Sequence, residues 1–376
     1  MEWVKVDNKS VGKKMMKYFK PFFNIYITPL RILTNKGVLF EKAVFRMLFE
    51  EFNKKSKFSW LRYSRIPRNF FAENITPHKL DDVGIILQGP IRYEDDFTLE
   101  TAKLYRYYYP KSVIVISTWK GVKDTFIKAC NEINVFVKEN EYPPFNGKYN
   151  INYQICSSFE GLKFLESHNC KFALKSRTDQ RFINDNFLVY FRNLQKIFPV
   201  NNIKMAKNKL KDRIIIPGPS VKKFPFYIGD MYAFGTIDDL KFLYGSDYFL
   251  DKNALDFANL EALKKYEHKE CADDYKDVTL IYRDVFATTF SAEHYLGYCL
   301  YSNIIGEADV EKDDLLDLYW SFLKNYCVVA DREMLGWFWP KYDYESTVIF
   351  NKYEAGGLDF SSWLDIYLNY KPKNKF

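Results

Sequence analysis

The sequence lacks paired cysteines and paired histidines. Its six cysteines are widely spaced, with no CxxC or Cys/His ligand pair, and its four histidines form no HExxH-like pair. These spacings indicate neither a structural zinc site nor a disulfide framework, and they fit a reducing cytosol. Because no catalytic triad can be nominated from the linear sequence either, hydrolase chemistry is not favoured.

Two nucleotide-binding motifs and long apolar runs are missing as well. The chain has no GxxxxGK[ST], which argues against a P-loop kinase, and no GxGxxG after the first expected strand, so nicotinamide binding is unsupported. No apolar run approaches the ~20 residues of a membrane span, and the amino terminus lacks the apolar region and cleavage site of a signal peptide. We therefore expect a cytoplasmic chain that can lie on a membrane but does not cross it.

Basic charge is concentrated in the first 80 residues. They hold 17 Lys/Arg and 6 Asp/Glu, whereas the whole chain carries +7, so residues 81–376 are net acidic. The lysines at 13–20 alternate with Met and aromatic residues. Such a segment can lie on an anionic membrane, where each cation adds about 1 kcal/mol, or it can form a helical subdomain with its cations in water. No RNP, KH or helix-turn-helix pattern accompanies the charge, so nucleic acid is not an expected partner.

From residue 83, short apolar runs alternate with helical patterns. An apolar run that is closed by turn residues is typical of a strand buried on both faces. The expected strands are 83–88, 113–119, 133–137, 172–175 and 213–216, and the expected helices are 97–107, 121–130 and 150–167. This alternation predicts an α/β fold with a mostly parallel sheet flanked by helices.

Charged groups crowd the end of the expected strand at 172–175. Arg177, Asp179 and Arg181 follow this apolar run. In an open α/β sheet the ligand crevice lies beyond the carboxyl ends of the strands, where these side chains would meet a charged substrate. The alternative is a solvated corner with a surface ion pair.

Other polar residues also have two interpretations. Asn152 and Gln154 are either solvated or ligand-binding, depending on which way their end of the helix faces. Asp230 lies within a long aromatic run, and its carboxylate either accepts hydrogen bonds from backbone amides or binds a polyol hydroxyl. Glu293 either stabilises a helix dipole or acts in catalysis, and the tryptophans at 337 and 339 belong either to packing or to a sugar platform.

The combination of cations and carboxylates suits transfer from a phosphorylated or nucleotide-activated donor. A diphosphate leaving group gains negative charge as its bond breaks, so Arg, Lys or a metal held by Asp lowers the barrier. A second carboxylate can take the proton of the acceptor hydroxyl.

Five segments together resemble a known family, the WavE-type lipopolysaccharide synthesis proteins, over about residues 83–300. They are Ile86–Ile91 (ILQGPI), Tyr109–Pro110 followed by Ile114–Trp119, Asn152–Gln154 (NYQ), Lys175–Arg181 (KSRTDQR) and Ile228–Met231 (IGDM). The resemblance implies a GT-A-like, Rossmann-like nucleotide-sugar fold and glycosyltransferase activity. We expect helical additions at both ends, with an N-terminal segment at 1–80, a nucleotide-sugar and acceptor domain at 81–305 and a C-terminal extension at 306–376.

The resemblance also implies roles for individual residues. Asp179 resembles the last acid of a DxD motif, which would hold Mn²⁺ or Mg²⁺, but Arg177 stands where the first acid would be and can itself neutralise a diphosphate. Asp230 and Glu293 are the expected catalytic carboxylates. The expected nucleotide-binding residues are Gln88, Gly89, Pro90, Thr118, Asn152, Gln154, Lys175, Arg177, Thr178 and Arg181.

The sequence therefore predicts a glycosyltransferase that moves a sugar from a nucleotide-sugar donor to a glycan or lipid-linked glycan acceptor. The acceptor class would be a lipopolysaccharide, lipooligosaccharide or capsular polysaccharide, at the inner face of the cytoplasmic membrane. The alternatives are a polyol-phosphate or nucleotidyl transferase that uses the same cations, and a non-catalytic scaffold of such a pathway.

Overall fold

The structure is a computed structural model that describes several separate segments of the chain, most of them after residue 76. The described residues are 58–60, 65–67, 77–144, 146, 150–218, 225–245, 292–306, 314–339 and 357–373. The chain divides into two units, Met1–Ala72 and Glu73–Phe376. Of the first unit, the structure describes two short antiparallel strands, β1 (Phe58–Trp60) and β2 (Arg65–Pro67). The basic run at 13–20 and the expected N-terminal helices lie outside the described residues.

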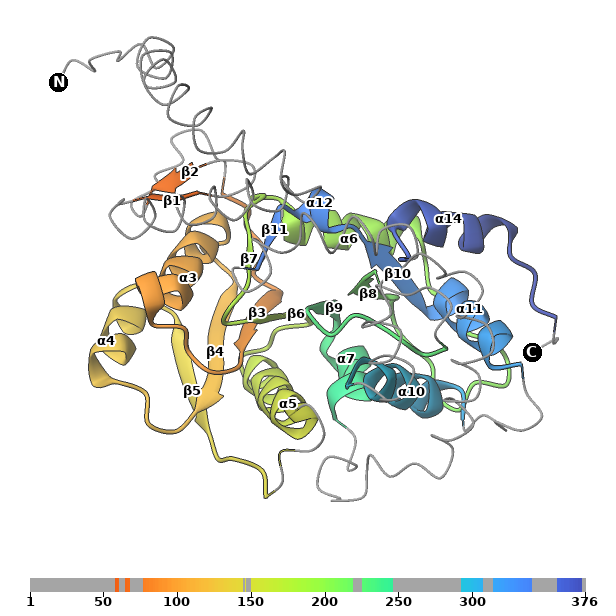
Figure 1. The fold of residues 1–376 in the computed structure, drawn as a ribbon, viewed down its shortest axis with the longest axis horizontal. Coiled ribbons are helices and arrows are strands. Elements are labelled where there is room, and N and C mark those ends of the chain that lie inside the picture. Colours follow the sequence, from red (N-terminus) through yellow and green to blue (C-terminus); the bar gives the residue numbers. More distant parts are fainter. Residues whose placement is uncertain are drawn as a thin grey trace, which may run out of the picture. The chain divides into compact units, whose positions relative to one another are not determined.

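The second unit is built on a seven-stranded mixed sheet (Figure 1). Its strand order is β10-β8-β9-β6-β3-β4-β5, and all neighbours are parallel except β9, which is antiparallel to both β6 and β8. The predicted α/β class with a mostly parallel sheet is therefore confirmed. The strands are β3 (Val83–Gln88), β4 (Val113–Trp119), β5 (Phe136–Asn140), β6 (Phe172–Arg177), β8 (Ile214–Pro217), β9 (Ala233–Thr236) and β10 (Cys327–Ala330).

Three helices connect the successive parallel strands β3, β4, β5 and β6. They are α3 (Phe97–Tyr108), which follows the short 3₁₀ turn η1 (Glu94–Asp96), α4 (Asp124–Glu132) and α5 (Ile151–Ser167). The expected strand at 133–137 begins later, at Phe136, because Ile133 caps α4 and Asn134 takes a left-handed turn at φ 55°.

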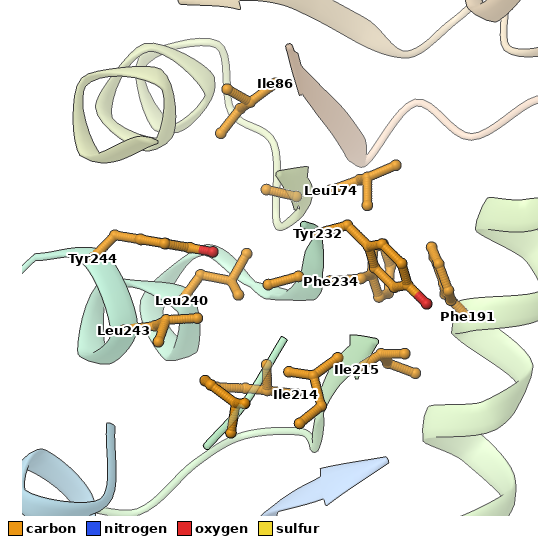
Figure 2. Packing of buried hydrophobic residues seen from close by; sticks show 14 of the residues in the cluster. Ile86, Leu174, Phe191, Ile214, Ile215, Tyr232, Phe234, Leu240, Leu243 and Tyr244 are labelled. Carbon is orange, nitrogen blue, oxygen red and sulfur yellow. The ribbon is translucent and has the colours of Figure 1, made fainter. Parts of the chain in front are cut away.

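Helices cover both faces of the sheet (Figure 1). On one face lie α5, α7 (Ile237–Tyr244) and α10 (Ala292–Ile304); on the other lie α3 and α6 (Phe187–Ile197). A Cβ on Gly161 of α5 would lie only 2.7 Å from Ile86 Cγ2, so glycine allows this helix its close approach to β3. Figure 2 shows Leu240 and Leu243 of α7 on one side of β8 and β9, with Phe191 of α6 on the other.

The C-terminal residues form helices and also complete the sheet. Helix α11 (Leu315–Tyr326) leads directly into the edge strand β10. After α12 (Arg332–Leu335), the strand β11 (Trp337–Phe338) pairs with β7 (Arg181–Phe182). Helix α14 (Phe360–Asn369) packs on α11 and β10 through Trp363, which is fully buried and donates from Nε1 to the Leu323 carbonyl at 3.3 Å.

None of the helices in the described part of the chain combines the length and the apolar character that crossing a bilayer requires.

Replacing Trp363 tests whether α14 is an integral part of this fold. We expect Trp363→Ala to lower the free energy of unfolding by about 3–5 kcal/mol, because a large buried side chain leaves a cavity. Urea denaturation measures the effect, with Ser361→Ala on the exposed side of the same helix as the control. A loss below about 1 kcal/mol for Trp363→Ala would show that α14 contributes little to the core.

Candidate functional site

Polar side chains gather where β3, β4 and β6 end. In the sheet register Gln88 is paired with Arg177 on one side and with Ser117 on the other. Side chains at paired positions of parallel strands share a face, so all three lie on the face that α5 covers, as the hydrogen bond from Ser117 Oγ to the Ser157 carbonyl at 2.6 Å confirms. Lys175, two residues before Arg177, shares this face. The carboxyl ends of these strands, where the sequence predicts the crevice, therefore carry several polar side chains on one face of the sheet.

Helix α5 begins at this same edge of the sheet. Its first turn holds Asn152 and Gln154, both buried, and Gln154 Nε2 donates to the Asp230 carbonyl at 3.1 Å. Lys175 Nζ donates to the same carbonyl at 2.6 Å. Asp230, whose side chain is half-buried, is thus tied to β6 and α5 through its backbone. The N-terminal end of α5 also turns the positive end of its dipole toward the site.

Lys175 is fully buried beneath the site. Burial lowers the pKa of this lysine to about 7, and the nearby Asp230 carboxylate only partly opposes the shift. The ammonium also lies 5.6 Å from the ring centre of Tyr244. Lys175 therefore exchanges its proton near neutral pH.

Arg177 and Asp179 form a bidentate ion pair. Arg177 donates from Nε to Asp179 Oδ1 at 2.9 Å and from Nη2 to Oδ2 at 3.1 Å. Trp339 Nε1 donates to the same Oδ2 at 3.0 Å, and its ring lies 4.9 Å from the guanidinium carbon. Burial alone would raise the pKa of Asp179, but the hydrogen bonds and charge of Arg177, together with the Trp339 bond, lower it. The guanidinium is therefore held in one orientation while its side chain stays 27% exposed.

Thr178 ties the ends of β3 and β6 together. Its backbone N–H donates to the Gln88 carbonyl at 3.0 Å, and its Oγ1 donates to the Pro90 carbonyl at 2.6 Å. Between them Gly89 has φ +115°, and a Cβ there would lie 3.3 Å from Thr178 Oγ1. This Gln-Gly-Pro turn thus needs glycine for both its backbone conformation and its contact with Thr178.

Two expected nucleotide-binding residues lie elsewhere. Arg181 reaches α3, where it donates to Thr101 Oγ1 at 2.9 Å and to the Phe97 carbonyl at 3.1 Å. Burial lowers its pKa, and its guanidinium lies 4.4 Å from the Phe97 ring centre. Thr118 is buried on the face of β4 opposite Ser117. Arg181 is thus bound to α3, and Thr118 lies on the sheet face opposite that of Gln88 and Ser117.

Glu293 lies in the first turn of α10 and is half-buried. The ring of its neighbour His294 lies 4.8 Å from that of Tyr227, which precedes Asp230 by three residues. The two expected catalytic carboxylates therefore belong to elements that pack together.

The side chains around Asp179 do not form a ligand set for a divalent cation. Both of its carboxylate oxygens accept hydrogen bonds from Arg177 or Trp339. Mg²⁺ and Mn²⁺ prefer several oxygen ligands, whereas the described residues bring no three His, Cys, Asp or Glu side chains together as a metal-binding group.

Sequence reasoning did not assign several aromatic residues to this edge. The sequence allows Trp339 to serve either in packing or as a sugar platform. Its contact with Asp179 joins residues 160 positions apart, which no local pattern can indicate. At the end of β4, Trp119 stacks on Tyr142 with ring centres 4.6 Å apart and also contacts Tyr153 of α5 at 5.2 Å. The apolar run that predicted β4 includes Trp119 but does not signal this cluster.

Comparison with known proteins gives one match that covers most of the chain. The model of the WavE family, described as WavE lipopolysaccharide synthesis, matches residues 83–375. No curated protein matches the chain.

Solved structures match only distantly. A cytidylyltransferase from Leptospira borgpetersenii serovar Hardjo-bovis is 14% identical with a TM-score of 0.28, over 44% of this chain and 64% of the other. Mouse xyloside xylosyltransferase 1 is 10% identical with a TM-score of 0.28, over 50% of this chain and 76% of the other. This chain thus spans less than two thirds of the cytidylyltransferase, and TM-scores this low carry no information about activity.

The buried lysine predicts a particular pH dependence of stability. In the unfolded chain Lys175 keeps its proton up to its ordinary pKa of 10.5, whereas in the folded chain it loses the proton near pH 7. Between these values the unfolded state binds more protons, so Lys175 makes the free energy of unfolding rise with pH, by up to about 1.4 kcal/mol per pH unit.

Urea denaturation between pH 6.5 and 9.5 measures this slope. We expect Lys175→Met to lack the contribution and Lys171→Met, which replaces an exposed lysine just before β6, to keep it. Equal slopes in the wild type and in Lys175→Met would contradict the lowered pKa.

Proposed function

The chain belongs to the WavE lipopolysaccharide synthesis family, and we propose that it is a glycosyltransferase that uses a nucleotide-sugar donor. The acceptor is a glycan or lipid-linked glycan of a lipopolysaccharide, lipooligosaccharide or capsular polysaccharide. The observation that carries this proposal is the oriented guanidinium of Arg177 at the carboxyl end of β6, beside the buried Lys175 and the tethered Asp230.

Arg177 and Lys175 stabilise the leaving diphosphate in this proposal. Transfer breaks the bond between the anomeric carbon of the sugar and a diphosphate oxygen, and the electron pair stays on the diphosphate. Arg177 bonds the oxygens that gain charge, while Lys175 and the N-terminal end of α5 add positive potential from below. Since Asp179 and Trp339 already fix the guanidinium, little reorganisation is needed when the bond breaks.

Asp230 and Glu293 are the proposed groups for the acceptor. One of these carboxylates takes the proton of the acceptor hydroxyl as its oxygen bonds to the anomeric carbon. Asp230 is better placed, because the bonds from Lys175 and Gln154 to its carbonyl hold its backbone beside the leaving-group site. Glu293 is proposed as an acceptor contact from α10.

Asp179 acts as a positioning residue for Arg177 in this scheme. A pair of acids would hold a metal against the diphosphate, but here an arginine takes the first position and the remaining acid orients it. The proposed transfer therefore runs without Mn²⁺ or Mg²⁺.

The basic N-terminal segment is proposed to hold the enzyme at the inner face of the cytoplasmic membrane, close to a lipid-linked acceptor. The support is its charge, since residues 1–80 hold 17 Lys/Arg against 6 Asp/Glu. We expect deletion of residues 1–35 to lower co-sedimentation with anionic liposomes but not with neutral ones. Unchanged binding to anionic liposomes after the deletion would refute this part of the proposal.

Thermal shift against UDP, GDP, CDP and CMP tests the nucleotide site. We expect one nucleotide to stabilise the wild type selectively, by about 2.7 kcal/mol at 100 times its dissociation constant, and equally well in EDTA. Arg177→Met should abolish the shift, because the diphosphate loses its guanidinium. Arg192→Met, which replaces a half-buried arginine on α6, should retain it.

Activity assays then separate the enzyme classes. A glycosyltransferase that uses a nucleoside-diphosphate sugar releases the nucleoside diphosphate, whereas a nucleotidyltransferase joins the nucleoside monophosphate unit of a nucleoside triphosphate to the acceptor and releases pyrophosphate. We expect Asp179→Asn to lower kcat about 100-fold through loss of the Arg177 orientation. Absence of any nucleotide response in the wild type would refute the glycosyltransferase proposal.

A further inference from the structure

A stacked pair of aromatic rings stands at the edge of the candidate site. Trp119 ends β4, and Tyr142 lies two residues after β5 ends at Asn140, the position paired with Trp119. The two rings are nearly parallel, at 17° and 4.6 Å between centres, and Tyr153 of α5 contacts both. Tyr142 nevertheless remains 56% exposed. More than half of Tyr142 is therefore accessible to solvent in spite of its contacts with Trp119 and Tyr153.

This pair lies on the same face and edge of the sheet as Arg177. The residues Arg177, Gln88 and Ser117 are paired across β6, β3 and β4, and Trp119 follows Ser117 by two positions. Two strand spacings, about 10 Å, separate β6 from β4, and a third places β5, which Tyr142 follows, about 14 Å from β6. A ligand that binds both Arg177 and the aromatic pair would therefore extend across β3 and β4.

A buried acceptor lies between the two. Gln88 is only 7% exposed, and within the described residues its Oε1 has no hydrogen-bond partner. A buried amide oxygen without a donor is costly. A hydroxyl of a ligand that runs from Arg177 to Trp119 would supply the missing donor.

We propose that Tyr142, backed by Trp119, is the stacking platform for the nucleobase of the donor, and that Gln88 accepts a hydrogen bond from its ribose. The inference rests on the proposed nucleotide-sugar site, because it takes the diphosphate at Arg177 as its starting point. Flat aromatic faces stack with any nucleobase. Asp230 lies on the other side of β6 from β4, so the sugar and the acceptor occupy the opposite end of the site.

Calorimetric titration with the nucleotide selected by the thermal shift and with inorganic pyrophosphate tests the platform. In the wild type the nucleoside diphosphate should bind more tightly than pyrophosphate. We expect Tyr142→Ala to raise the dissociation constant of the nucleoside diphosphate about tenfold, which equals about 1.4 kcal/mol. The dissociation constant of pyrophosphate should not change. Tyr142→Phe keeps the ring and should retain the affinity.

Tyr107→Ala is the matched control, because Tyr107 is an exposed tyrosine on α3, at 41% exposure. The inference is overturned if Tyr142→Ala binds the nucleoside diphosphate as the wild type does, or if it weakens both ligands equally. In either case the wild type still binds the nucleotide and the proposed function stands. If the wild type binds neither ligand, the proposed function fails and the platform fails with it.

Discussion

The orientation of one guanidinium is the constraint on which the candidate site depends. An arginine at the end of a strand would normally sample many rotamers, but Asp179 binds Arg177 through both carboxylate oxygens and Trp339 closes the group from the C-terminal part of the chain. The cost of ordering this side chain is met during folding, so a bound diphosphate does not have to meet it. The C-terminal strands and helices are therefore part of the site as well as of the sheet.

The antiparallel direction of β9 explains why Asp230 lies near Lys175 and Arg177. Because β9 runs against β6, the segment before it arrives at the carboxyl end of β6, where Asp230 lies. Lys175 and Gln154 then bind the Asp230 carbonyl from β6 and α5. If β9 were parallel to β6, the segment before it would lie at the amino ends of the strands, away from Arg177. One reversed strand thus places a carboxylate beside the cations.

The sequence predicted the strands that form continuous apolar runs, and it failed where contacts are distant. Val83–Gln88 and Val113–Trp119 were expected at the observed bounds, because burial on both faces imposes an unbroken apolar run. The strand Ala233–Thr236 was not recognised, since it is short and continues an aromatic segment without its own turn signals. Arg177 and Gln88 share a face because of the sheet register, and Trp339 reaches Asp179 through tertiary packing. Neither contact can be predicted from the spacing of residues in the sequence.

A crystal structure of the protein with a nucleoside diphosphate, grown in the presence of Mn²⁺, tests the central claim most directly. We expect a diphosphate oxygen within about 3.2 Å of the Arg177 guanidinium, with Asp179 still bound to Arg177 and no metal on its carboxylate. A manganese ion coordinated by Asp179, with Arg177 turned away from the diphosphate, would contradict the account.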